Sequence, residues 1–213
     1  MRIERGPDPG PFGHHRQYKP SLRVVFRSRC AYCLMHDDKL GGEDGATVDH
    51  FKPVGRYPEL RLVWSNLYYA CTFCNCHYKK QHPTPAEEAN GKRFVDPCAE
   101  DPDEHFRMIP DQQTGDLTRI RPLTAAAEYA VFRLKLNDRK FLRDYWRKNH
   151  EEEKELVTLI GEIQNQLLVC EELVIWQDLS QGASLRAYFD SQLETCIQNL
   201  REVRSRRPFP AEV

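Results

Sequence analysis

Four cysteines stand in two closely spaced pairs that could bind one metal ion. Cys30 and Cys33 form the first pair, Cys71 and Cys74 form the second, and residues 34–70 separate the pairs. Four thiolates at the ends of two C-x-x-C turns complete a tetrahedral zinc site. A redox pair is the alternative for a lone C-x-x-C, but two pairs without a thioredoxin-like βαβ pattern favour zinc. The spacing therefore predicts a structural zinc that joins the two ends of the intervening segment.

The residues in and next to that segment suit metal-assisted hydrolysis. Asp49 and His50 are adjacent, Asn66 follows them, and Asn75 comes directly after the last cysteine of the second pair. Mg²⁺ prefers carboxylate and amide oxygens, and histidine can act as a general base near neutral pH. Each residue also has a structural interpretation: a satisfied Asp-His pair, a turn asparagine, and a helix cap. Within a frame fixed by zinc, the combination favours a catalytic site.

The order of these motifs resembles that of the HNH endonucleases. The chain carries Cys-x-x-Cys, Asp-His-x-x-Pro, Asn-Leu and Cys-x-x-Cys-Asn in this order, with nine residues from Asn66 to Asn75. The resemblance implies a small ββα-metal core supported by a zinc knuckle, with His50 as the general base. It also implies Asp49 and Asn75 as ligands of a catalytic Mg²⁺ or Mn²⁺, and Asn66 as the residue that orients the histidine loop. The structural zinc, held by the four cysteines, would stay outside the chemistry.

Basic residues after the last motif are candidates for contacts with nucleic acid. The family often has a lysine three residues after the last motif residue, but Tyr78 stands there in this chain. The expected contacts are therefore His77, Lys79 and Lys80. Residues 1–82 carry 13 Lys and Arg against 8 Asp and Glu, and residues 83–213 carry 18 against 24. A positive first part is consistent with phosphate binding there.

The predicted fold class is α+β and mainly helical, with the small HNH core followed by a helical C-terminal module. Residues 1–20 are rich in proline and glycine and predict a flexible arm. Residues 21–82 would form the nuclease core, with a helix capped by Ser21 and a strand at residues 46–51. Residues 83–121 read as an irregular linker packed on the core, and residues 122–207 as the helical module.

Two apolar stripes in the C-terminal module predict an antiparallel helical hairpin that turns near Gly182. Their members step by three or four residues, the spacing of a helix seam. The stripes are Leu156, Ile160, Ile163, Leu167, Cys170 and Val174, and then Leu185, Phe189, Leu193, Cys196, Leu200 and Val203. Cys170 and Cys196 are therefore expected to be core thiols and not metal ligands.

Composition argues for a cytoplasmic protein that does not enter a membrane. The chain has no apolar run of about 18 residues, which a spanning helix needs. Its first residues lack the apolar segment of a signal peptide. The eight cysteines are then better explained as metal ligands and buried thiols than as disulfides.

A second, less specific resemblance extends beyond the core. Asp96-Pro97, Asp101-Pro102-x-x-His-Phe and Leu134-x-Leu-Asn resemble the downstream region of HNH proteins found beside ATPases in bacterial anti-phage systems such as Septu and some retrons. It implies a defence nuclease with a neighbouring ATPase as its partner. Aromatic residues such as Tyr145, Trp146 and Trp176 need a cover, which could be that partner or the nuclease core itself.

The function expected from the sequence is metal-dependent endonucleolytic cleavage of DNA. A different class of protein remains open, a catalytically silent zinc-bound adaptor for nucleic acid or protein. The absence of Asp49, His50 or Asn75 would indicate such an adaptor, and all three residues are present. An HNH nuclease directed at RNA is the other alternative, because no residue decides between DNA and RNA.

Overall fold

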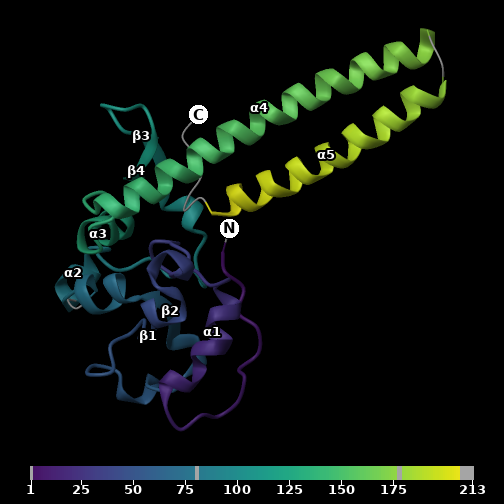
Figure 1. The fold of residues 1–213 in the computed structure, drawn as a ribbon. Helices are drawn as coiled ribbons and strands as arrows, with labels where there is room; N and C mark the ends of the chain where they lie inside the picture. The colour runs from purple at the N-terminus through teal and green to yellow at the C-terminus, as the bar shows by residue number, and fades with distance from the viewer. Residues whose placement is uncertain (1, 80–81, 177–178, 207–213) are drawn as a thin grey trace. The chain divides into compact units, whose positions relative to one another are not determined.

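The computed structural model describes residues 2–79, 82–176 and 179–206, and these form a mixed α+β fold as predicted (Figure 1). Two small antiparallel sheets, a cluster of four cysteines and a helical C-terminal region make up the structure. The chain divides into two compact units, Met1–Tyr145 and Trp146–Arg207. The predicted domain boundary at residue 122 therefore lies inside the first unit.

The first sheet is a hairpin of β1 (Ala46–His50) and β2 (Leu67–Cys71). Ala46 pairs with Cys71 at one end and His50 pairs with Leu67 at the other. Every residue of β2 is buried, so this strand lies in the middle of the core. The hairpin therefore connects the cysteine cluster, at one end, to the residues around His50 at the other.

The N-terminal arm packs on this hairpin and does not behave as the predicted flexible lead. One guanidinium nitrogen of Arg5 donates to the carbonyls of Trp64 and Leu67, at 2.9 and 2.8 Å. The same guanidinium lies 4.3 Å from the ring centre of Tyr68, and the indole N–H of Trp64 donates to the carbonyl of Gly6. These cation–π and hydrogen-bond contacts compensate for the scarcity of regular structure in a segment rich in proline and glycine.

The arm leads into a 3₁₀ turn, η1 (His15–Tyr18), and then into α1 (Lys19–Val25). Proline stands in the first turn of α1, where its missing N–H costs nothing. The helix therefore starts before Ser21, and the expectation that Ser21 caps it is wrong. Leu22 is its fully buried residue.

Residues 83–121 contain regular structure where an irregular linker was predicted. They include α2 (Pro85–Ala89) and most of a second hairpin, β3 (Phe106–Pro110) with β4 (Leu117–Pro122). Met108 and Ile120 pair across this hairpin and both are buried. The next helix, α3 (Ala125–Arg133), begins with Thr124 as its cap, because the threonine oxygen accepts a hydrogen bond from the N–H of Ala127.

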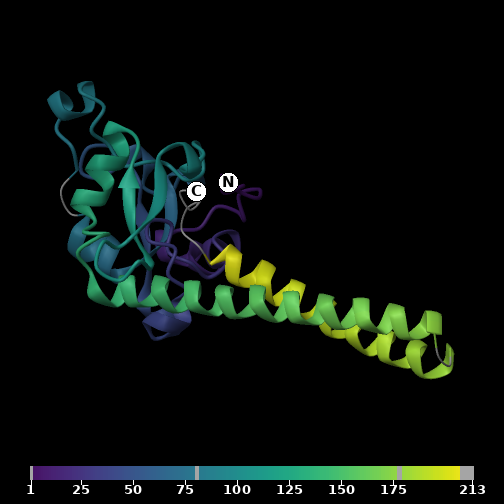
Figure 2. The same ribbon diagram turned by 90° about the horizontal axis from the view of Figure 1, so that it is seen from above.

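The helical unit is a hairpin formed by α4 (Lys140–Trp176) and α5 (Leu179–Ser205), which run side by side in both views (Figures 1 and 2). Ile163, Cys170, Cys196 and Val203 are buried, which confirms these seam positions and the two core thiols. Leu185, which was predicted in the seam, is exposed instead, and the Val174 side chain lies outside the described part. Arg204 and Glu153 join the helices by a 2.9 Å ion pair. The turn was expected near Gly182, which instead lies within α5; a helix tolerates one glycine for about 1 kcal/mol.

Candidate active site and metal centre

The four predicted metal ligands meet in one buried cluster. The sulfur atoms of Cys30, Cys33, Cys71 and Cys74 all lie within 4.8 Å of one another, and those of Cys33 and Cys71 are 3.8 Å apart. Zinc–sulfur bonds of about 2.3 Å in a tetrahedron place neighbouring sulfurs about 3.8 Å apart. The donor set and its spacing therefore fit zinc, and the closed shell leaves no position for a substrate.

Arg139 is a partner of this cluster that the sequence did not reveal. Both terminal nitrogens of its guanidinium lie 3.5 Å from the sulfur of Cys74, and the residue is buried. Four thiolates around a divalent ion leave a net charge of about −2, which a nearby cation offsets. Arg139 lies 65 positions after Cys74, so no local motif indicates the contact.

His50 is held in the tautomer that a general base requires. Its Nε2 lies 2.9 Å from the carbonyl oxygen of Arg61. A carbonyl only accepts hydrogen bonds, so Nε2 carries the proton and donates it there. The neutral ring then has its lone pair on Nδ1, which can accept a proton from water. The side chain is partly exposed, as access by a substrate demands.

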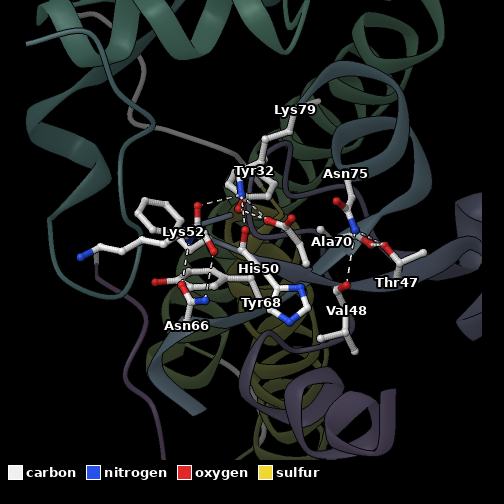
Figure 3. A network of polar contacts seen from close by, with 12 residues as sticks. Tyr32, Thr47, Val48, His50, Lys52, Asn66, Tyr68, Ala70, Asn75 and Lys79 are labelled. Atoms are coloured by element: carbon white, nitrogen blue, oxygen red, sulfur yellow. Dashed lines mark hydrogen bonds and ion pairs between the residues drawn. The ribbon is translucent and has the colours of Figure 1, made fainter. Parts of the chain in front are cut away.

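Asn66 fastens the loop that follows His50 (Figure 3). Its amide oxygen accepts from the N–H of Lys52 at 2.8 Å, and its amide nitrogen donates to the carbonyls of Lys52 and Leu60 at 3.1 and 3.2 Å. The side chain is buried and touches both ends of the loop. These contacts suit an orienting role, and they leave none of the Asn66 polar atoms free for catalysis.

Asn75 presents its amide oxygen as a free acceptor. Its nitrogen donates to the hydroxyl of Thr47 at 2.9 Å and to the carbonyl of Val48 at 3.4 Å (Figure 3). No described residue donates to its oxygen. The two contacts hold the amide against β1, and the oxygen remains available to a hard cation.

Asp49 and Lys79 form a buried ion pair. Lys79 Nζ lies 2.5 Å from Asp49 Oδ2, and the hydroxyl of Tyr32 donates to the same oxygen. Asp49 is 5% exposed and Lys79 is 2% exposed. The expectation that Lys79 contacts nucleic acid is therefore not met, because its ammonium points into the core. Oδ1 is the atom of Asp49 that no described hydrogen bond occupies.

The ammonium of Lys79 also fixes the end of β1. It donates to the carbonyls of His50 and Phe51, at 3.1 and 3.3 Å, and the rings of Tyr32, Phe51 and Phe94 surround it within 5.5 Å. Burial lowers the pKa of Lys79, and the charge of Asp49 opposes that shift. Burial, followed by the charge of Asp49, raises the pKa of Tyr32. Tyr32 lies between the cysteines of the first pair, so the network connects the zinc knuckle to the strand that carries His50.

A π-helix directly precedes Lys79, the residue that reaches this site. Residues Phe73–Tyr78 form η6, and the N–H of Lys79 donates to the carbonyl of Cys74, five residues back. Each hydrogen-bonded ring of a π-helix holds one residue more than in an α-helix. Lys79 follows η6, and its ammonium contacts Asp49 and His50 at the end of β1. His77 is exposed, and Lys80 lies outside the described residues.

Replacing Lys79 by methionine is expected to lower the free energy of unfolding by about 3–5 kcal/mol, because it leaves the Asp49 carboxylate buried without its cation. Lys39→Met is the matched control: Lys39 is 59% exposed and lies 3.4 Å from Asp38. An exposed pair contributes about 0–1 kcal/mol. Urea unfolding of the wild type and both variants measures the difference. Equal effects of the two substitutions would contradict a structural role for the buried pair.

The comparisons with known proteins agree with this geometry. The family model of the HNH endonucleases matches residues 30–82, which include both cysteine pairs, Asp49, His50 and the two asparagines. These residues are therefore an HNH endonuclease domain with a cluster of four cysteines. No curated protein matches the chain. The match does not extend to residues 1–29 or 83–213.

Proposed function

We propose that this protein is a metal-dependent HNH endonuclease that hydrolyses phosphodiester bonds of DNA. The observation that carries the proposal is the hydrogen bond that orients the His50 ring within the HNH domain. Its Nε2 is bound to the carbonyl of Arg61, and its Nδ1 is left to accept a proton. A partly exposed imidazole with one nitrogen oriented by a carbonyl is suited to activate water.

The proposed mechanism assigns one role to each residue. His50 Nδ1 takes a proton from the water that attacks the phosphorus, and Asn66 keeps the histidine loop in place. Asn75 Oδ1 and Asp49 Oδ1 would hold a Mg²⁺ or Mn²⁺, for which an amide and a carboxylate oxygen are fitting donors. When bound, that cation supplies stabilisation of the charge on the phosphate and on the leaving 3′ oxygen. Lys79 neutralises the second oxygen of Asp49 and fixes the carbonyl of His50.

Cleavage of purified nucleic acid tests this function. Supercoiled plasmid, linear duplex and an RNA of matching sequence are incubated with the protein and Mg²⁺, Mn²⁺ or a chelator. We expect nicked or linear plasmid with either metal and intact plasmid with the chelator. Cleavage of RNA alone would favour the RNA-directed alternative. Binding without cleavage under every metal condition would favour the silent adaptor.

We further propose that the protein is the nuclease effector of a bacterial anti-phage system and acts in the cytoplasm with a neighbouring ATPase. Exposed apolar side chains on the helical unit support a protein partner: Val157, Leu159, Leu168, Val169, Leu185 and Tyr188. Tyr145 and Trp146 are buried in the chain and give no support, and the Trp176 side chain lies outside the described part. Among described residues, no helix is long and apolar enough to cross a membrane.

Co-purification with the product of the adjacent gene tests the partner. The variant Leu168→Glu with Val169→Glu places charge on the exposed face and should lose the ATPase, while Gln164→Glu, an exposed polar position of the same helix, should retain it. Retention by both variants would remove this surface from the proposal.

A further inference from the structure

We propose that the N-terminal arm and the loop after His50 form the surface that binds the nucleic-acid backbone beside the scissile phosphate. The surface, here called the arm–loop surface, consists of His14, His15, Arg16 and Arg61. The inference rests on the proposed function and names where its substrate lies. It replaces Lys79, which is buried, as the expected phosphate contact.

The arm reaches the catalytic histidine directly. The ring centre of His15 lies 4.8 Å from that of His50, and the ring centre of His14 lies 4.3 Å from that of His15. The carbonyl of Arg61 accepts the hydrogen bond from His50 Nε2, so the Arg61 side chain starts next to the same ring. A phosphate bound at His50 would therefore lie beside these side chains.

The arm is held firmly enough to act as a binding surface. His14 caps η1, because its Nδ1 accepts from the N–H of Arg16 and its own N–H donates to Gln17. Tyr18 follows in the same turn, is buried, and stacks on Trp64 with 5.8 Å between ring centres. Caps and buried aromatic contacts of this kind fix the direction of a short segment. The positions of His15 and Arg16 thus follow from packing on the core.

The charge of this surface is not neutralised by the protein. Arg16 and Arg61 are exposed, and among the residues that the structure describes no carboxylate forms an ion pair with either. Arg56 and Arg93 of the first unit, by contrast, pair with Glu88 and Glu100. Unpaired arginines around a catalytic group are suited to planar, bidentate binding of phosphate.

The lowered pKa of His15 is consistent with an excess of positive charge around its ring on the arm–loop surface. Burial, followed by the charges of His50, His14, Arg16 and Arg61, lowers the pKa of His15 to about 4. The ring is therefore neutral at pH 7. Its Nδ1 is buried and lacks a hydrogen-bond partner among the described residues, which is uncommon for a buried polar atom.

The salt dependence of DNA binding tests the arm–loop surface separately from cleavage. The full chain carrying His50→Ala serves as the parent, with a fluorescent DNA duplex and Ca²⁺. Arg16→Ala and Arg61→Ala are added singly and together. Each lost phosphate contact should make the slope of log K against log salt concentration less steep by about 0.9. Affinity at low salt should fall with each substitution.

Arg201→Ala is the matched control, since Arg201 is an exposed arginine of α5 in the helical unit. It should leave the slope unchanged. Parent-like slopes for both arm–loop variants would overturn the surface, whereas DNA cleavage by the wild type, measured in parallel, would still uphold the proposed function. A parent chain that binds no DNA would overturn the surface as well. Circular dichroism checks that the substitutions leave the fold intact.

Discussion

Replacing His50 by alanine is expected to lower the rate of DNA cleavage by about 10²–10⁴-fold, the usual contribution of a positioned general base. The variant loses the only described side chain that combines a carbonyl-oriented Nε2 with a free Nδ1 in the HNH segment. Single-turnover cleavage at saturating DNA, with Mg²⁺ present, measures the effect without contributions from binding. Asp49→Ala and Asn75→Ala should also slow cleavage, and higher concentrations of Mn²⁺ should restore part of the loss if these residues hold the cation.

Two measurements separate a chemical defect from a structural one. No described contact joins the His50 side chain to the cysteine cluster, so zinc content and melting temperature should match those of the wild type. His77→Ala removes an exposed imidazole from the same unit and should retain the wild-type rate at saturating DNA. An unchanged rate for His50→Ala would remove the proposed base.

The sequence predicted the residues of the site better than their partners. The C-x-x-C spacing determines which sulfurs can share one ion, so the cluster could be derived without coordinates. The contact between Lys79 and Asp49 could not, because the two residues are 30 positions apart and Lys79 follows a π-helix. Sequence periodicity distinguishes strands from α-helices but carries no signal for a short π-helix.

The hairpin of β3 and β4, which was not predicted, has an alternating pattern in its sequence that the composition of the segment obscured. Phe106 and Met108 alternate with less buried positions in β3, as Thr118 and Ile120 do in β4. Gly115, with φ of 73°, supplies the turn between them. The surrounding Asp, Glu and Pro residues obscured this pattern, and an irregular linker was predicted. The alternating face is nevertheless buried, and that face determines a strand.

The arm was misjudged for a different reason. Proline and glycine lower the propensity for helix and strand, but they do not prevent a chain from packing. Arg5 fixes the arm through two carbonyls and the face of Tyr68, all distant in sequence. Such long-range contacts determine whether an irregular segment is ordered, and they leave no local pattern in the sequence.

Replacing Cys71 by serine is expected to abolish zinc binding and unfold the first unit. Structural zinc contributes roughly 10–16 kcal/mol of apparent binding free energy in small zinc-finger peptides, and a whole domain is stable by only about 5–15 kcal/mol. Cys71 also ends β2 and pairs with Ala46, so loss of the metal releases the hairpin that carries His50. Zinc content by mass spectrometry, far-UV circular dichroism and DNA cleavage should all fall together, and Cys30→Ser should behave in the same way.

Cys76→Ser provides the matched control for the loss of a thiol. Cys76 is exposed and lies two residues after Cys74, so the same chemical change at this position removes no ligand. That variant should retain one zinc per chain, the wild-type melting temperature and cleavage. The helical unit is compact by itself, so part of the helical signal should persist in Cys71→Ser. A folded Cys71→Ser protein without zinc would show that the knuckle does not need its metal, whereas one that retains zinc would show that Cys71 is not an essential ligand.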